Sequence, residues 1–201
     1  MLAKGLGLDA DEVAAVARLL DNAGDGARGI GLQALVETAA GLLRAGEIAA
    51  ASPRVESLII GYADLGASLG RAPGVAAPER WLYAQETVLV AARAAGVQAI
   101  DGPYLEFRDE EGLRLRAEHV RVLGYDGKWA VHPRQLAIIN TVFTPGAEEV
   151  AHARAVLDAL ASAEGRGAIE LGGAMIDEAS RKHALEVVAR ARMTGRQEVA
   201  R

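Results

Sequence analysis

A chain of 201 residues is long enough to bury one hydrophobic core, and its lack of cysteine leaves no disulfide to support the fold. The net charge of −5 disfavours a nucleic-acid-binding surface, and no apolar run is long enough for a membrane span or a signal peptide. We therefore expect a cytoplasmic protein with neither nucleic acid nor membrane as a partner. Aromatic residues make up only 4%, which favours helices packed around a core of aliphatic strands.

The N-terminal part of the chain begins with a short apolar run and a helical pattern. Residues 1–3 are apolar and could end a strand. A helix is expected to follow, through about residue 22, with Asp9 or Asp11 as its cap and apolar residues on one face.

Two strand signals follow, and each is succeeded by a carboxylate. The apolar run 32–36 stops at Glu37, an alanine-rich helix is expected over 38–51, and the apolar run 58–60 precedes Asp64 in an expected loop. The carboxyl ends of parallel strands meet at one edge of a sheet or barrel, where ligands bind. Because carboxylate oxygens suit Mg²⁺, the pair is a candidate metal site. The alternative is that Glu37 caps a helix and Asp64 caps a turn.

The rest of the chain continues the alternation of strands and helices. The expected elements are a helix over 78–95, a strand over 97–100, a helix capped by Asp109, a strand over 127–131, a helix from Pro133 to about residue 142, and a helix capped by Thr144. Asp101 and His132 stand at strand ends. Asp101 could serve a site or only a turn, and His132 could be a base or ligand or only structural. The glycine-rich residues 165–175 indicate a small hairpin or loop, and a last helix is expected over 178–192.

Five strands that alternate with helices, most with polar residues at their carboxyl ends, predict part of a (β/α) barrel. A complete barrel needs eight strands. The expected fold class is therefore α/β: an incomplete (β/α)8 TIM barrel of about five strand–helix units, with a small C-terminal hairpin–helix extension. We expect a partial-barrel domain over residues 1–164 and the extension over 165–201.

Three segments together resemble the citrate lyase β-subunit and malyl-CoA lyase group of the HpcH/HpaI aldolase superfamily. They are VETAAGLLRAGEIAAASPRVESLIIGYADLGASLG, AIDGPYLEFRDEEGLRLRAEHVRVLGYDGKWAVHPRQLAIINTVFTP and GGAMID. The resemblance implies a (β/α)8 barrel that uses Mg²⁺ to make or break a carbon–carbon bond in an acyl-CoA thioester substrate. It also implies that strands one to three of the barrel, and an arginine used near the thioester oxygen, are absent from this chain.

The resemblance assigns roles to three residues. Glu37 and Asp64 match the family's magnesium ligands, and through the metal they would bind the acid half of the substrate. Asp177 matches a catalytic aspartate that reaches a neighbouring subunit's site, which implies a homo-oligomer. A helix cap is an equal alternative for Asp177.

Several functions remain open at this stage. The first is cleavage of malyl-, citramalyl- or citryl-CoA to acetyl-CoA and a keto acid, with a malyl-CoA thioesterase as a close variant. The second is a truncated, non-catalytic paralogue or accessory subunit that keeps the fold and the metal site. An aldolase acting on free pyruvate-derived acids is a third, weaker hypothesis.

Overall fold

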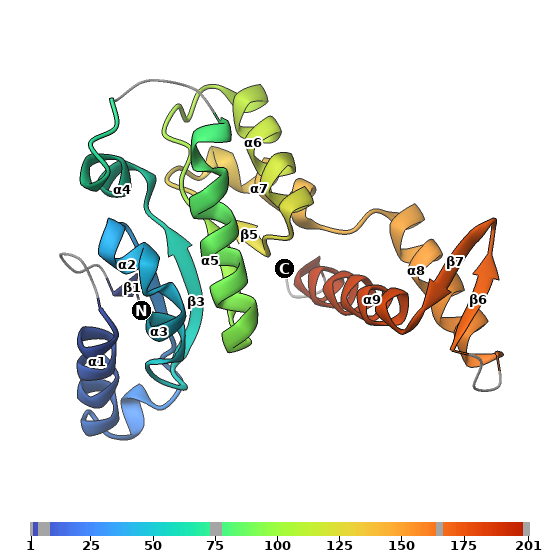
Figure 1. Ribbon diagram of the computed structural model, residues 1–201, viewed down its shortest axis with the longest axis horizontal. Helices are drawn as coiled ribbons and strands as arrows, with labels where there is room; N and C mark the ends of the chain where they lie inside the picture. Colours follow the sequence, from blue (N-terminus) through green and yellow to red (C-terminus); the bar gives the residue numbers. More distant parts are fainter. Residues whose placement is uncertain (1, 4–8, 73–77, 164–166, 199–201) are drawn as a thin grey trace. The chain divides into compact units, whose positions relative to one another are not determined.

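The computed structural model describes residues 2–3, 9–72, 78–163 and 167–198. The chain forms two compact units, Met1–Ile139 and Asn140–Arg201. The first unit is built on a parallel sheet and the second on a hairpin with two helices (Figure 1). In the described part of the chain, no helix combines the length and the apolar character that crossing a bilayer requires.

A five-stranded parallel sheet lies at the centre of the first unit. Its strands follow one another in chain order: β1 Leu2–Ala3, β2 Leu32–Val36, β3 Val55–Ile60, β4 Gln98–Asp101 and β5 Gly127–Lys128. Each neighbouring pair runs parallel, so all the carboxyl ends lie at the same edge of the sheet. This confirms the expected parallel α/β arrangement of the first unit.

Helices connect the strands of this sheet, and a further helix, α7 Arg134–Phe143, follows the last strand. The connecting helices are α1 Ala10–Asn22, α2 Ala39–Leu43, α3 Ala45–Ala50, α4 Tyr62–Ser68, α5 Leu82–Ala95 and α6 Glu110–Leu123, with short 3-10 turns η1 Asp25–Ala27 and η2 Pro78–Trp81. Helix α5 packs against α3, β3 and β4 (Figure 1). Leu58 and Ile59 point to opposite faces of β3 and are 0% and 2% exposed, so both faces of this strand are covered. Burial on both faces is typical of parallel sheets.

The structure corrects several of the expected elements, and the strand expected over 127–131 is limited to Gly127–Lys128. The helix expected over 38–51 is broken at Arg44, whose φ of −110° and ψ of 18° leave the helical region, and the poor helix formers Gly41 and Gly46 flank the break. Asp64 lies in helix α4 rather than in the expected loop. The sequence did not predict this helix, because seven residues are too few to show a clear periodic pattern. Thr144 caps no helix, since the next helix begins after Gly146, whose backbone is extended.

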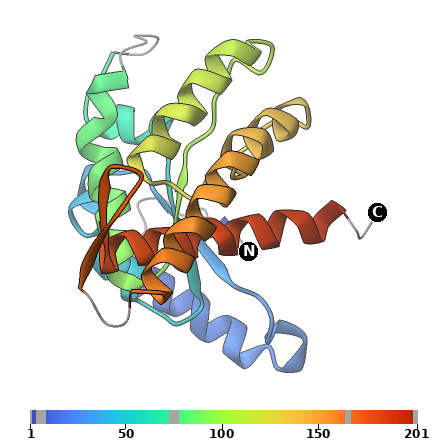
Figure 2. The ribbon, with the colours of Figure 1, turned by 90° about the vertical axis from the view of Figure 1, so that its right-hand side faces the viewer.

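The second unit contains the expected hairpin between two helices. Its elements are α8 Ala147–Ala161, β6 Ala168–Leu171, β7 Ala174–Asp177 and α9 Glu178–Glu198. The strands pair antiparallel through Gly172 and Gly173, whose φ values of 60° and 85° suit a tight hairpin turn. The hairpin packs against α8 and the start of α9 (Figures 1 and 2). The buried core of this unit consists of Ala153, Val156, Ile176, Ala184, Val187 and Val188. Helix α9 continues past residue 192, where the last helix was expected to end.

Candidate functional site

The two candidate metal ligands border the turn between β3 and α4. Glu37 follows the last residue of β2 and is 7% exposed, whereas Asp64 is exposed in the first turn of α4. The Gly61 N–H donates to the Val36 carbonyl at 2.9 Å, which extends the β2–β3 pairing to the start of α4. A Cβ on Gly61 would lie 2.7 Å from Glu37 Cβ and 3.1 Å from Glu37 Oε2. The absence of a side chain at Gly61 therefore lets the start of α4 lie directly against Glu37.

The chemistry of these two carboxylates fits a hard divalent cation. Mg²⁺ is bound in proteins through one or two carboxylates while it keeps several waters. In the ranges that the structure describes, no group of three or more Asp, Glu or His side chains could hold a metal ion. A cation held by Glu37 and Asp64 would thus take its other ligands from water or from a bound molecule.

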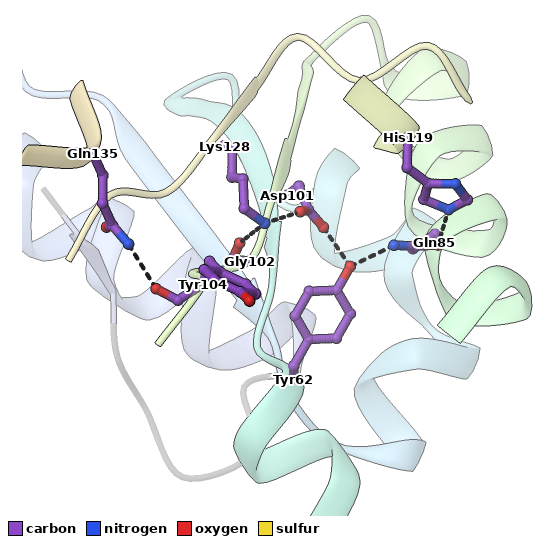
Figure 3. A network of polar contacts seen from close by, with 8 residues as sticks. All are labelled: Tyr62, Gln85, Asp101, Gly102, Tyr104, His119, Lys128 and Gln135. Carbon is purple, nitrogen blue, oxygen red and sulfur yellow. Dashed lines mark hydrogen bonds and ion pairs between the residues drawn. The ribbon is translucent and has the colours of Figure 1, made fainter. Parts of the chain in front are cut away.

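A buried polar network joins the ends of β4 and β5 to the start of α4 (Figure 3). Asp101 Oδ2 pairs with Lys128 Nζ, and each side chain is only 2% exposed. Lys128 Nζ also donates to the Gly102 carbonyl at 2.7 Å. The Tyr62 hydroxyl donates to Asp101 Oδ1, and Gln85 Nε2 donates to the Tyr62 hydroxyl oxygen at 2.7 Å. Both charges of the buried ion pair are therefore neutralised and hydrogen-bonded inside the protein.

Two tyrosines of this region, the half-buried Tyr62 and the buried Tyr125, act as hydrogen-bond donors. Burial raises the pKa of Tyr62, and the negative charge of Asp101 raises it further. Burial also raises the pKa of Tyr125, whose hydroxyl donates to the Gln85 carbonyl at 2.9 Å. Both phenols are consequently neutral at physiological pH. The His119 ring nitrogen Nε2 lies 3.4 Å from Gln85 Oε1, so α6 also contacts the network.

The end of β4 lies against the end of β3 without room for a side chain between them. A Cβ on Gly102 would be 2.3 Å from the Ile60 carbonyl oxygen and 2.7 Å from Cδ2 of Tyr62. The Tyr62 ring meets the Trp81 ring edge-on, with centroids 4.9 Å apart. The first residue of α4 is therefore enclosed by backbone on one side and by an aromatic ring on another.

His132 has a local structural role. Its ring stacks on Phe107 with centroids 4.9 Å apart, and its Nδ1 accepts a hydrogen bond from the Arg134 N–H at 3.2 Å. These contacts agree with the structural alternative, in which His132 is held in the connection from β5 to α7.

Asp177 caps helix α9. Its Oδ1 accepts from the Ser180 N–H at 3.1 Å, and the Asp177 N–H donates to Ser180 Oγ at 3.2 Å. The hydrogen bond from the Ser180 backbone is the main cause that lowers the pKa of Asp177. This geometry agrees with the helix-cap alternative, while a role in a neighbouring subunit's site stays a prediction.

Sequence reasoning missed Tyr62, Gln85 and Lys128. A signal was available for Lys128, because a lysine within a short, otherwise apolar strand needs a partner when it is buried. In the sheet, Lys128 and Asp101 are register partners on neighbouring strands. The partner could not be read from spacing along the chain, because α6 separates the two strands.

Comparisons with known proteins give one consistent family. Residues 8–133 match the family model described as HpcH/HpaI aldolase/citrate lyase. The L-malyl-CoA/beta-methylmalyl-CoA lyase of Cereibacter sphaeroides is 36% identical over 94% of this chain and 65% of its own length. The citrate lyase subunit beta of Escherichia coli is 37% identical over 82% of this chain and 55% of its own. The chain thus spans less than two thirds of the length of these relatives.

Solved structures show the same similarity in three dimensions. The CitE protein of Mycobacterium tuberculosis, in complex with magnesium, acetoacetate and coenzyme A, has a TM-score of 0.74 at 31% identity, over 94% of this chain and 67% of its own. A citrate lyase from Burkholderia xenovorans has a TM-score of 0.79 at 29% identity, over 97% of this chain and 63% of its own.

Proposed function

Because residues 8–133 match the family model, the chain belongs to the HpcH/HpaI aldolase/citrate lyase family, and we propose that it is a Mg²⁺-dependent carbon–carbon lyase. The proposed substrate is a 3-hydroxyacyl-CoA of the malyl-, citramalyl- or citryl-CoA type, which is cleaved to acetyl-CoA and a keto acid. The similarity to a malyl-CoA lyase and to a citrate lyase subunit supports this class of reaction. Since the chain spans 65% of the lyase's length, the activity of the 201-residue chain is itself part of the proposal.

The observation that supports the proposal most directly is the contact between Glu37 and the turn that carries Asp64. Glu37 lies at the end of β2 against Gly61, and Asp64 follows in the first turn of α4. In the proposal both carboxylates hold Mg²⁺, as the magnesium in the related CitE structure suggests. When bound, the ion supplies Lewis-acid polarisation of the substrate oxygens.

The chain's own residues would hold and orient the reacting groups. Glu37 is nearly buried, so its carboxylate has little freedom, whereas the exposed Asp64 leaves one side of the site open to substrate. Gly61 provides the space in which the two elements meet. In the proposal, Glu37 and Asp64 bind the substrate through the metal.

We further propose that the five-stranded sheet is an incomplete (β/α)8 barrel, with a C-terminal extension and a homo-oligomeric assembly. The TM-scores of 0.74 and 0.79 to related structures support the barrel. The division into residues 1–164 and 165–201 stays a prediction. So does the role of Asp177 as a catalytic residue that reaches a neighbouring subunit's site.

Magnesium binding to the purified chain, measured by isothermal titration calorimetry, tests the metal assignment. Glu37→Gln and Asp64→Asn should each weaken Mg²⁺ binding about tenfold or more, since even supporting residues of metal sites have effects of that size. Glu47→Gln is the matched control, because Glu47 is also an exposed acid in the first turn of a helix, α3. Equal affinities in the wild type and in both site variants would refute the metal site.

An assay of keto-acid release from malyl-CoA and citramalyl-CoA tests the reaction. Turnover that is lost in Glu37→Gln and Asp64→Asn would support the lyase. Mg²⁺ binding without turnover would instead favour the non-catalytic accessory subunit or truncated paralogue.

A further inference from the structure

Helix α4 carries Asp64 and is held at its first residue by a hydroxyl of the buried network. The Tyr62 hydroxyl donates to Asp101 and accepts from Gln85 Nε2, so its proton and one of its lone pairs are used (Figure 3). The preceding residue, Gly61, lies against Glu37. The first turn of α4 is therefore fixed between the end of β2 and the end of β4.

We propose that Tyr62 is a positioning residue for the metal site: the Asp101–Lys128 ion pair holds its hydroxyl, and the hydroxyl sets the orientation in which α4 presents Asp64 beside Glu37. The inference rests on the proposed function, in which Glu37 and Asp64 bind the metal. It adds a residue that contacts neither the metal nor the substrate.

The ion pair gives the tyrosine a strong and fixed acceptor. A hydrogen bond to an ionised carboxylate is about twice as strong as one between neutral groups. Lys128 pairs with Asp101, and its second bond, to the Gly102 carbonyl, ties the pair to the backbone at the end of β4. The position of Asp101 is thus fixed by contacts that do not involve the Tyr62 hydroxyl.

The Tyr62 ring is held by packing, including its contact with the backbone at Gly102, whereas its hydroxyl makes directional hydrogen bonds. Trp81 meets the Tyr62 ring edge-on. Trp81 is itself in contact with the Arg71 guanidinium, which lies 4.4 Å from the centre of the Trp81 ring. These contacts are apolar or diffuse, so they restrain the ring without fixing a direction. Removal of the hydroxyl alone should therefore loosen the start of α4 and leave the ring packed.

Tyr62→Phe tests the inference, with Tyr125→Phe as a matched control. Both variants remove one buried phenol hydroxyl from the same network, but only that of Tyr62 belongs to α4. Tyr62→Phe should weaken Mg²⁺ binding about tenfold, at the lower end of the range for residues that support metal ligands. In the absence of metal, hydrogen exchange at the Leu65 N–H, which donates to the Gly61 carbonyl, should become about fivefold faster, as expected for one lost hydrogen bond. Tyr125→Phe should change neither quantity.

The outcomes separate this inference from the proposed function. Unchanged Mg²⁺ affinity in Tyr62→Phe, beside a loss in Asp64→Asn, would overturn the inference and leave the metal site standing. Equal effects in Tyr62→Phe and Tyr125→Phe would also overturn it, because they would reflect a general loss of stability. If Asp64→Asn bound Mg²⁺ as the wild type does, the proposed metal site would fail, and this inference with it.

Discussion

Replacement of Lys128 by methionine is expected to destabilise the first unit by about 3–5 kcal/mol, the usual cost of breaking a buried ion pair from one side. Asp101 and Lys128 are each 2% exposed, so water cannot replace the lost ammonium group. Methionine fills a similar volume, and the cavity contribution is therefore small. Since domains have a total stability of roughly 5–15 kcal/mol, the effect is a large share of it.

A double-mutant cycle isolates the charge from the packing. Asn at position 101 still accepts from the Tyr62 hydroxyl but needs no cation, so Lys128→Met combined with Asp101→Asn should be less destabilised than the sum of the single variants, by about 2 kcal/mol. Urea unfolding followed by tryptophan fluorescence is the assay, because Trp81 and Trp129 both belong to the first unit. A cost of Lys128→Met below about 1 kcal/mol, or strictly additive variants, would refute the buried ion pair.

The ion pair between Arg28 and Asp25 provides the control for this cycle. It lies at the 3-10 turn η1 of the first unit, at 2.9 Å, and the two side chains are 81% and 85% exposed. Exposed pairs contribute about 0–1 kcal/mol, so Arg28→Met should cost far less than Lys128→Met. Similar costs for the two variants would show that burial does not determine the energy of these pairs.

Two further predictions concern backbone contact and alkaline pH. Gly102→Ala should destabilise the first unit by about 1–3 kcal/mol, because its Cβ would lie 2.3 Å from the Ile60 carbonyl oxygen, and an unchanged urea midpoint would contradict this contact. The folded-state pKa values of Tyr62 and Tyr125 lie above their ordinary value of 10.0, so their contribution to stability is complete below pH 10 and falls as pH rises above it. Each phenol contributes a slope of up to about 1.4 kcal/mol per pH unit to the free energy of unfolding. The double variant Tyr62→Phe, Tyr125→Phe should therefore lose less stability between pH 10 and higher pH than the wild type. Equal slopes in the two proteins would contradict the raised pKa values of these phenols.

Local sequence patterns predicted the strands and the positions of Glu37 and Asp64 better than they predicted the contacts between strands. The run 32–36 ends at Glu37 both in the pattern and in the structure, because an apolar run that stops at a charge marks the end of a buried strand. Helix α4 was missed because only Leu65 and Gly66 of its seven residues are buried, too few to show a period. The partner of Lys128 was missed because register between strands depends on the whole sheet.

The carboxyl edge of the sheet is held by contacts that leave little room for adjustment. Gly61 lies against Glu37 where β2 meets β3, and Gly102 lies against the Ile60 carbonyl where β3 meets β4. The buried ion pair joins β4 to β5 at the same edge. These contacts hold Glu37 and the turn that carries Asp64 from the strands on either side. Metal and substrate sites depend on support of this kind, so the buried charges at this edge fit an edge that carries the proposed metal ligands.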